Sequence, residues 1–221
     1  EFQSDFTFSW DPEWVFENCE KLADLDQGTV ILLENLDRLG GKTGWKTVKA
    51  LKDKLLNQFG QVYRNWIGDL RLYVDKVCVE VVDPLFLFEN GRFFDSTAVE
   101  AEAVETVKPF DVVSKSGETG KIKIRASVLP PNFQWADPKA MSPKHKGRLQ
   151  VMARNNGIHI CRAGREIDFV QPPFTKFQNN DRNIKIEIDF DPVLDEPFGI
   201  TTSKQQVTID DDMWDCLMNT G

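Results

Sequence analysis

Apolar residues recur at helical spacing in three parts of this chain. From Thr47 to Ile67 they return at steps of three and four residues, and Gly68 follows where such a helix would end. A shorter helix is predicted over residues 11–25, with Asp11 as its N-cap and a proline at its first position. The segment "VTIDDDMWDCLM" (207–218) predicts a further helix near the C-terminus, capped by an aspartate.

Other segments are typical of β-strands, because apolar residues alternate with polar ones or form short runs. The turn residues Asp75 and Lys76 separate two such segments and predict a hairpin. A stretch with four prolines, 130–147, predicts a loop. Strands are expected at 28–39, 70–74, 77–82, 121–129, 148–152, 157–162 and 183–190. Together the elements predict an α+β fold, in which a mixed or largely antiparallel sheet carries one long helix and some shorter ones.

Composition narrows the class of protein. A net charge of −8 over 221 residues argues against a chain built mainly to coat nucleic acid, although a local basic patch remains compatible with it. No apolar run approaches the ~20 residues that a membrane helix needs, and no signal peptide is recognisable, so a cytoplasmic location is expected. The four cysteines are widely spaced within apolar patterns, which indicates buried free thiols in a reducing compartment.

Most candidate chemical motifs are weak. The segment "LGGKTGW" (39–45) lacks the spacing of a phosphate-binding loop, and two histidines give neither a nucleophile–base set nor a zinc site. The acidic cluster of Asp210, Asp211, Asp212 and Asp215 would suit a divalent cation, but aspartates at a helix start are more often caps.

Two arginines and one lysine remain as candidates for anion binding. Arg162 and Arg165 flank a glycine in "CRAGREID" (161–168), where they would engage a phosphate or carboxylate, or else be solvated at an ordinary hairpin turn. Lys204 lies among small polar residues in "FGITTSKQQV" (198–207). A lysine is a compact charge on a flexible stem and suits a terminal phosphate, yet most loop lysines are simply solvated.

Five segments stand out when they are taken together and in order: "GTVILLENLDRL" (28–39), "FGQVYRNWIG" (59–68), "DKVCVEVVDPLFL" (75–87), "GIHICRAGREIDF" (157–169) and "IKIEIDFDPVLDEPFGITTSKQQV" (184–207). In this order they resemble the transducer half of GHKL ATPases, the superfamily of gyrase B, heat-shock-ninety, histidine kinases and MutL. The likeness is greatest to bacterial ATP-binding proteins and the MORC-like branch.

The resemblance implies a ribosomal-protein-S5-domain-2-like transducer fold over residues 28–221, with an unusual left-handed crossover. Residues 1–27 would then form a linker and helix that join the domain to an ATP-binding lobe. Residues 89–120, which are acidic and irregular, are expected to be a mobile insertion.

In such ATPases a transducer lysine contacts the γ-phosphate of ATP held in the neighbouring lobe. "TTSKQQ" resembles the segment that carries it, so this role transfers to Lys204, with Gln205 as its neighbour in the nucleotide contact. A fixed cation there would stabilise the charge that develops on the phosphoryl oxygens, and would report whether ATP or its product is bound. ATP and Mg²⁺ are the implied cofactors of the full-length protein, whose homodimerisation is also implied.

One departure from the family limits this chain. It contains neither the Asn box nor the D-x-G-x-G motif of the ATP-binding lobe, so we expect the fragment alone to bind no nucleotide and to be inactive. Its partner would be that lobe, in a longer protein of which this chain is the C-terminal portion. DNA is compatible as the eventual object, but nothing in the acidic chain requires it.

Two other functions are compatible with the sequence. A non-enzymatic protein- or nucleic-acid-binding module would use the edge formed by Arg162 and Arg165, and a metal-dependent hydrolase would use the Asp210 cluster.

Overall fold

The computed structural model describes Ile31 and residues 47–94, 102–103, 108–130, 142–173, 179–200 and 207–220. The chain divides into two units, Glu1–Lys46 and Thr47–Gly221, and the described helices and strands all belong to the second unit. The helix expected at 11–25 lies outside the described residues, as does the strand expected at 28–39 except for Ile31.

The long helix is α2, Val48–Val62. It begins where the Thr47 side chain accepts a hydrogen bond from the amide of Ala50, 3.1 Å away. It ends five residues before the expected Ile67, because residues 63–66 form turns. Gly60 lets α2 approach the chain at Glu80–Val82, whose backbone and side chains a Cβ at this position would strike. The amide of Val82 also donates to Gly60 O at 3.1 Å.

A small hairpin follows α2. Strands β1 (Tyr73–Val74) and β2 (Val77–Cys78) pair antiparallel and are shorter than expected. Asp75 and Lys76 both have positive φ, 47° and 63°, as a tight two-residue hairpin turn requires. The turn predicted from the sequence is therefore confirmed.

The main sheet has the order β3-β5-β8-β6-β7, and β4 pairs with β5 beside β3. Strands β6 and β8 are parallel and the other pairs antiparallel, so the predicted mixed sheet of an α+β fold is confirmed. The strands are β3 (Glu102–Ala103), β4 (Phe110–Val113), β5 (Thr119–Val128), β6 (Ile158–Arg162), β7 (Arg165–Val170) and β8 (Ile184–Phe190). Strand β4 and the first residues of β5 belong to the 89–120 segment, and both lie in this sheet.

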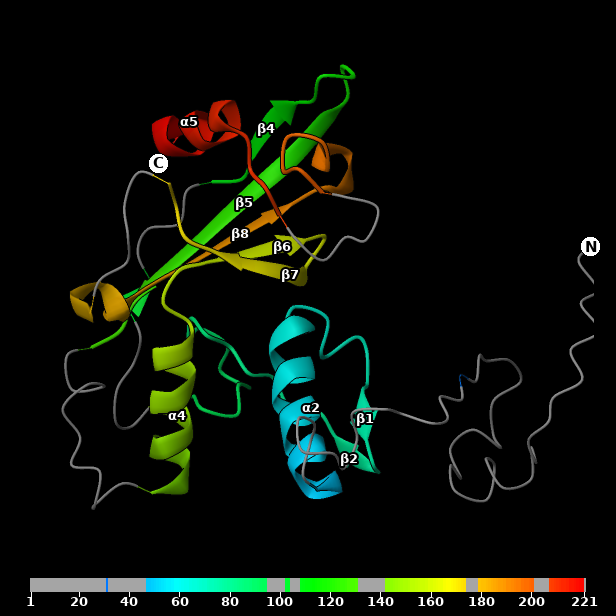
Figure 1. Cartoon of the computed structure of the whole chain (residues 1–221), viewed down its shortest axis with the longest axis vertical. Helices are drawn as coiled ribbons and strands as arrows, with labels where there is room; N and C mark the ends of the chain where they lie inside the picture. The colour runs from blue at the N-terminus through cyan, green and yellow to red at the C-terminus, as the bar shows by residue number, and fades with distance from the viewer. Residues whose placement is uncertain are drawn as a thin grey trace, which may run out of the picture. The chain divides into compact units, whose positions relative to one another are not determined.

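One face of the sheet is apolar and packs against α5, Asp211–Thr220 (Figure 1). Isoleucines from β5, β6 and β8 meet Met213, Trp214 and Leu217 of this helix. Asp210 directly precedes the helix, and its carboxylate accepts a hydrogen bond from the amide of Met213 at 2.9 Å. This confirms the predicted aspartate cap. The rings of Phe190 and Phe198 stack in the same core with centroids 3.8 Å apart.

A second core forms around α4, Pro143–Arg154, which the sequence did not predict. Residues 148–152 were expected to be a strand and 130–147 a loop. Both expectations are wrong in part, because α4 includes residues 148–152 and also residues 143–147 at the end of the expected loop. Ser142 caps this helix and Pro143 occupies its first turn, which favours helix over the strand that the apolar run suggested. Met152 packs there with Val82, Phe86, Phe93 and Leu129.

Two short 3-10 helices flank β8: η2, Asn179–Asn183, and η3, Pro192–Leu194. Of the described cysteines, Cys161 is buried, Cys216 is half-buried and Cys78 is exposed, so the prediction of buried thiols is wrong for Cys78. Among the described residues, no helix has both the length and the apolar character needed to cross a membrane.

Candidate functional site

Lys204 and Gln205 lie in residues 201–206, outside the described part of the chain, but both ends of that segment are described. Before it, Gly199 has a φ of +61° and lies so close to Thr208 that a Cβ would strike the backbone. The amide of Thr208 donates to Phe198 O at 3.2 Å, and that of Ile200 to Asp195 O at 2.8 Å. The two ends of the segment are thus held side by side over a buried phenylalanine.

A side chain from the sheet also holds the returning end. Asp168 of β7 accepts a hydrogen bond from the amide of Val207, 2.8 Å from its Oδ2. Its Oδ1 accepts from the amide of Phe169 at 2.8 Å. The residue that follows the 201–206 segment is therefore fixed to the sheet by a carboxylate.

Arg162 and Arg165 are each engaged within the protein. Arg162 forms a two-pronged ion pair with Asp195, with nitrogen–oxygen distances of 2.6 and 2.9 Å. The Arg165 guanidinium lies 5.7 Å from the ring centroid of Tyr63. The turn between the arginines has positive φ at Ala163 and Gly164, 49° and 82°, as a tight hairpin requires. An external anion would have to compete with Asp195 for Arg162.

The other face of the main sheet is polar, although much of it is buried. Alternation in β8 and its neighbours gathers charged and polar side chains on this face, and the register aligns Arg125 with Glu187 and Glu187 with His159. Gln61 at the end of α2 and the chain after this helix contact these groups. The buried side chains of this face include Ser127, His159, Cys161, Lys185 and Glu187.

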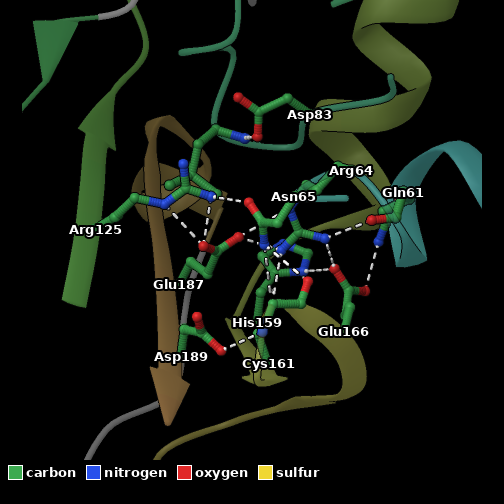
Figure 2. A network of polar contacts seen from close by, with 12 residues as sticks. Gln61, Arg64, Asn65, Asp83, Arg125, His159, Cys161, Glu166, Glu187 and Asp189 are labelled. Carbon is green, nitrogen blue, oxygen red and sulfur yellow. Dashed lines mark hydrogen bonds and ion pairs between the residues drawn. The ribbon is translucent and has the colours of Figure 1, made fainter. Parts of the chain in front are cut away.

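Arg64 lies two residues after the end of α2 and joins this part of the chain to the polar face of the sheet (Figure 2). Its side chain is fully buried and forms ion pairs with both Glu166 of β7 and Glu187 of β8. Arg125 of β5 also donates to Glu187, with Nε 2.8 Å from Oε1. Two carboxylates and two guanidiniums therefore compensate one another, as buried charges must.

Further polar side chains complete this network. Gln61 donates to Glu166 at 2.8 Å, and His159 Nδ1 lies 3.1 Å from the other Glu166 oxygen. Asn65 donates to Gly164 O at 3.1 Å and accepts from Arg125 at 2.9 Å. Together with the ion pairs of Arg64, these contacts tie residues 61–65 to β5, β7 and β8 and to the turn between β6 and β7.

The pKa values follow from this arrangement. Burial by itself would raise the pKa of Glu166, but the hydrogen bond and charge of His159 and the charge of Arg64 lower it to about 2. Burial likewise opposes the shift at Glu187, whose pKa is lowered by Arg64 and Arg125. Burial lowers the pKa of Arg64, yet the two glutamates more than offset it and the pKa is raised. All three groups therefore stay charged at neutral pH.

Two further groups on this face are shifted by burial. The pKa of Cys161 is raised, chiefly by burial, so this thiol is a poor nucleophile. Burial, with a contribution from Arg182, lowers the pKa of Lys185 to about 8. The Lys185 amine donates to the carbonyls of Met152 and Asn155 at 3.0 and 2.5 Å, at the end of α4, where the last carbonyls have no partner within the helix.

Chemically, the network suits holding an element in place rather than meeting a substrate. Its ionised groups are paired, and Arg64 and Glu187 at its centre are buried. Within the described ranges, no group of three or more histidine, cysteine, aspartate or glutamate side chains is placed to hold a metal ion. We therefore regard the network as the rigid base of the domain, and the anchored ends of the 201–206 segment as the candidate functional site.

Sequence reasoning missed the network. The alternation in "KIKIRASV" and "IKIEIDF" shows which side chains share a face, but not that the end of a helix and the chain after it contact the charged one. A signal was present in "GQVYRN", where Gln61, Arg64 and Asn65 put polar groups beside the apolar face of the helix.

No family model, no curated protein and no solved structure matches this chain.

Proposed function

We propose that this chain is the transducer domain of a GHKL-type ATPase, of the ribosomal-protein-S5-domain-2-like fold type. Lys204, with Gln205 beside it, would reach the γ-phosphate of ATP that is held with Mg²⁺ in an ATP-binding lobe of the same polypeptide. The domain would pass the state of the nucleotide to downstream modules.

The observation that carries the proposal is the anchoring of the segment that contains Lys204. The chain is fixed on both sides of residues 201–206, by the Phe198–Thr208 backbone contact and by Asp168. A lysine that acts on a phosphate must be presented reproducibly, because a cation stabilises a developing charge only when it is fixed in place beforehand. A segment held at both ends on a buried core supports that use.

The ordered resemblance of the five segments supports the proposal independently, and the mixed α+β sheet is compatible with the implied fold. The buried network adds a mechanical argument. A domain that transmits movement needs a stiff body, and Arg64 locks the chain after α2 to β7 and β8.

The binding-module alternative receives less support. Arg162 is already paired with Asp195 and Arg165 with the ring of Tyr63, so the two guanidiniums do not form a free anion clamp.

The test is the steady-state ATPase rate of the complete polypeptide, wild type against Lys204→Ala, with ATP affinity measured alongside. Losing one contact made in the transition state costs about 3 kcal/mol, so we expect kcat to fall by about a hundredfold. Lys121→Ala is the matched control, because Lys121 is exposed and the side chain of Asp111, with which it pairs, is exposed as well. An unchanged rate for Lys204→Ala in a folded protein would refute the proposal.

A further inference from the structure

Strand β7 contains an irregularity that decides where its acidic side chains point. Cys161 of β6 pairs with Glu166, but the adjacent Ile160 pairs with Asp168, so Ile167 is an extra residue in β7. Such a bulge shifts the alternation of faces by one residue. Glu166 and Asp168 would share a face in a regular strand, and here they point to opposite faces.

The contacts of the two carboxylates confirm that separation. Glu166 meets Arg64 and His159 on the charged face. Ile167 packs against the apolar core on the other face, and Asp168 reaches Val207, whose side chain also packs there.

Asp168 differs in kind from the other anchors of the segment. At the segment's base the contacts of Phe198, Ile200 and Thr208 are backbone hydrogen bonds. Asp168 contributes a charged side chain, and a carboxylate accepting from an amide forms a stronger hydrogen bond than a neutral acceptor. Its second oxygen is fixed by the amide of Phe169, so the carboxylate is itself held in one orientation.

We propose that Asp168 is a positioning residue, which fixes Val207 and through it supports the action of the lysine three residues earlier in the chain. This inference rests on the proposed function of Lys204. The anchor acts on the Val207 amide whether or not that function is correct, and this allows the two to be tested apart.

The first experiment measures amide hydrogen exchange at Val207 in this chain by NMR. We expect Asp168→Ala to accelerate exchange there by about 10- to 100-fold relative to wild type, the effect of losing a hydrogen bond to a charged group. Asp168→Asn should give a smaller increase, because its carbonyl oxygen still accepts. Asp111→Ala, at an exposed surface pair with Lys121, should leave Val207 unchanged. Unchanged exchange in Asp168→Ala would overturn the anchor.

The second experiment measures ATP hydrolysis in the complete polypeptide. Asp168→Ala should lower kcat at least tenfold, with ATP affinity nearly unchanged, and Asp168→Asn should recover part of the loss. The double variant Asp168→Ala/Lys204→Ala should be no slower than Lys204→Ala alone, because a positioning residue has nothing left to position.

The outcomes separate the two proposals. If Lys204→Ala slows hydrolysis and a folded Asp168→Ala does not, the positioning role is wrong and the proposed function stands. If the double variant is slower than Lys204→Ala by the full Asp168→Ala factor, Asp168 acts independently of the lysine and the inference is again wrong. If Lys204→Ala itself has no effect, the proposed function fails, whatever the exchange data show at Val207.

Discussion

Arg64 is the residue on which the buried polar face depends most. Its guanidinium is shared between Glu166 and Glu187, and no solvent reaches it to replace either partner. Burying these charged groups costs desolvation free energy, but removing one of them leaves the others buried without a compensating charge.

We therefore expect Arg64→Met to destabilise the protein by about 3–5 kcal/mol. Methionine keeps much of the length of the side chain, but the two buried glutamates lose the guanidinium that compensates their charges. Urea unfolding of the chain measures this change.

The matched control is Lys121→Met, which removes the ion pair of Lys121 with Asp111 at 3.1 Å, where both side chains are more than half exposed. Exposed pairs contribute about 0–1 kcal/mol, so the two variants should differ clearly. Equal losses would mean that the Arg64 network contributes no more than a surface contact.

The same network predicts how stability depends on acid. In the folded protein the pKa of Glu166 is lowered from its ordinary value of 4.5 to about 2, and the pKa of Glu187 is lowered as well. A carboxyl with a depressed pKa contributes stability that is present above its ordinary pKa and is lost as the pH falls toward the folded value. The free energy of unfolding should therefore fall between pH 4.5 and 2, by on the order of 3 kcal/mol for Glu166.

Urea unfolding at several pH values tests this dependence, with Glu166→Gln as the comparison. The variant should be less stable at neutral pH, and its stability should fall less steeply in this window. A slope identical to that of wild type would show that Glu166 does not titrate as the geometry implies.

At the scale of elements, the amine of Lys185 joins β8 to the end of α4. Its pKa is lowered to about 8 from 10.5, so the folded protein releases this proton before the unfolded chain does. The unfolded state then binds more protons between pH 8 and 10.5, and the free energy of unfolding should rise with pH in that window. Thermal unfolding of wild type and Lys185→Met checks this rise, which the variant should lose. A rise that persists in Lys185→Met would assign it to another group.

The spacing of apolar residues predicted those elements in which the local sequence pattern favours the same structure as the packing in the folded protein. Helix α2, strands β5, β6 and β8 and the Asp75–Lys76 turn all follow from spacing alone. Spacing did not predict helix α4, because "RLQVM" is a short, largely apolar run that is typical of a strand. Its helical state is set by the Ser142 cap and by packing with Phe93 and Val82, which lie far away in the sequence.

At the scale of the whole molecule, the chain combines an apolar core under α5 with a charged face locked by Arg64. The alternation of charge and apolar residues in β8 was visible in the sequence, but the partner of each charge was not, since Arg64 and Glu187 are 123 residues apart. The same limit applies to Asp168. Its contact with Val207 depends on an extra residue in β7 that no spacing rule anticipates.

The proposed function reduces to one claim, that Lys204 touches the γ-phosphate of ATP. The most direct measurement is affinity labelling of the complete polypeptide with an ATP analogue that carries a lysine-reactive group on its γ-phosphate, followed by peptide mapping. We expect the label on the peptide that contains Lys204, with labelling suppressed by excess ATP. A label placed on other lysines and absent from Lys204, in a protein that still hydrolyses ATP, would contradict the account.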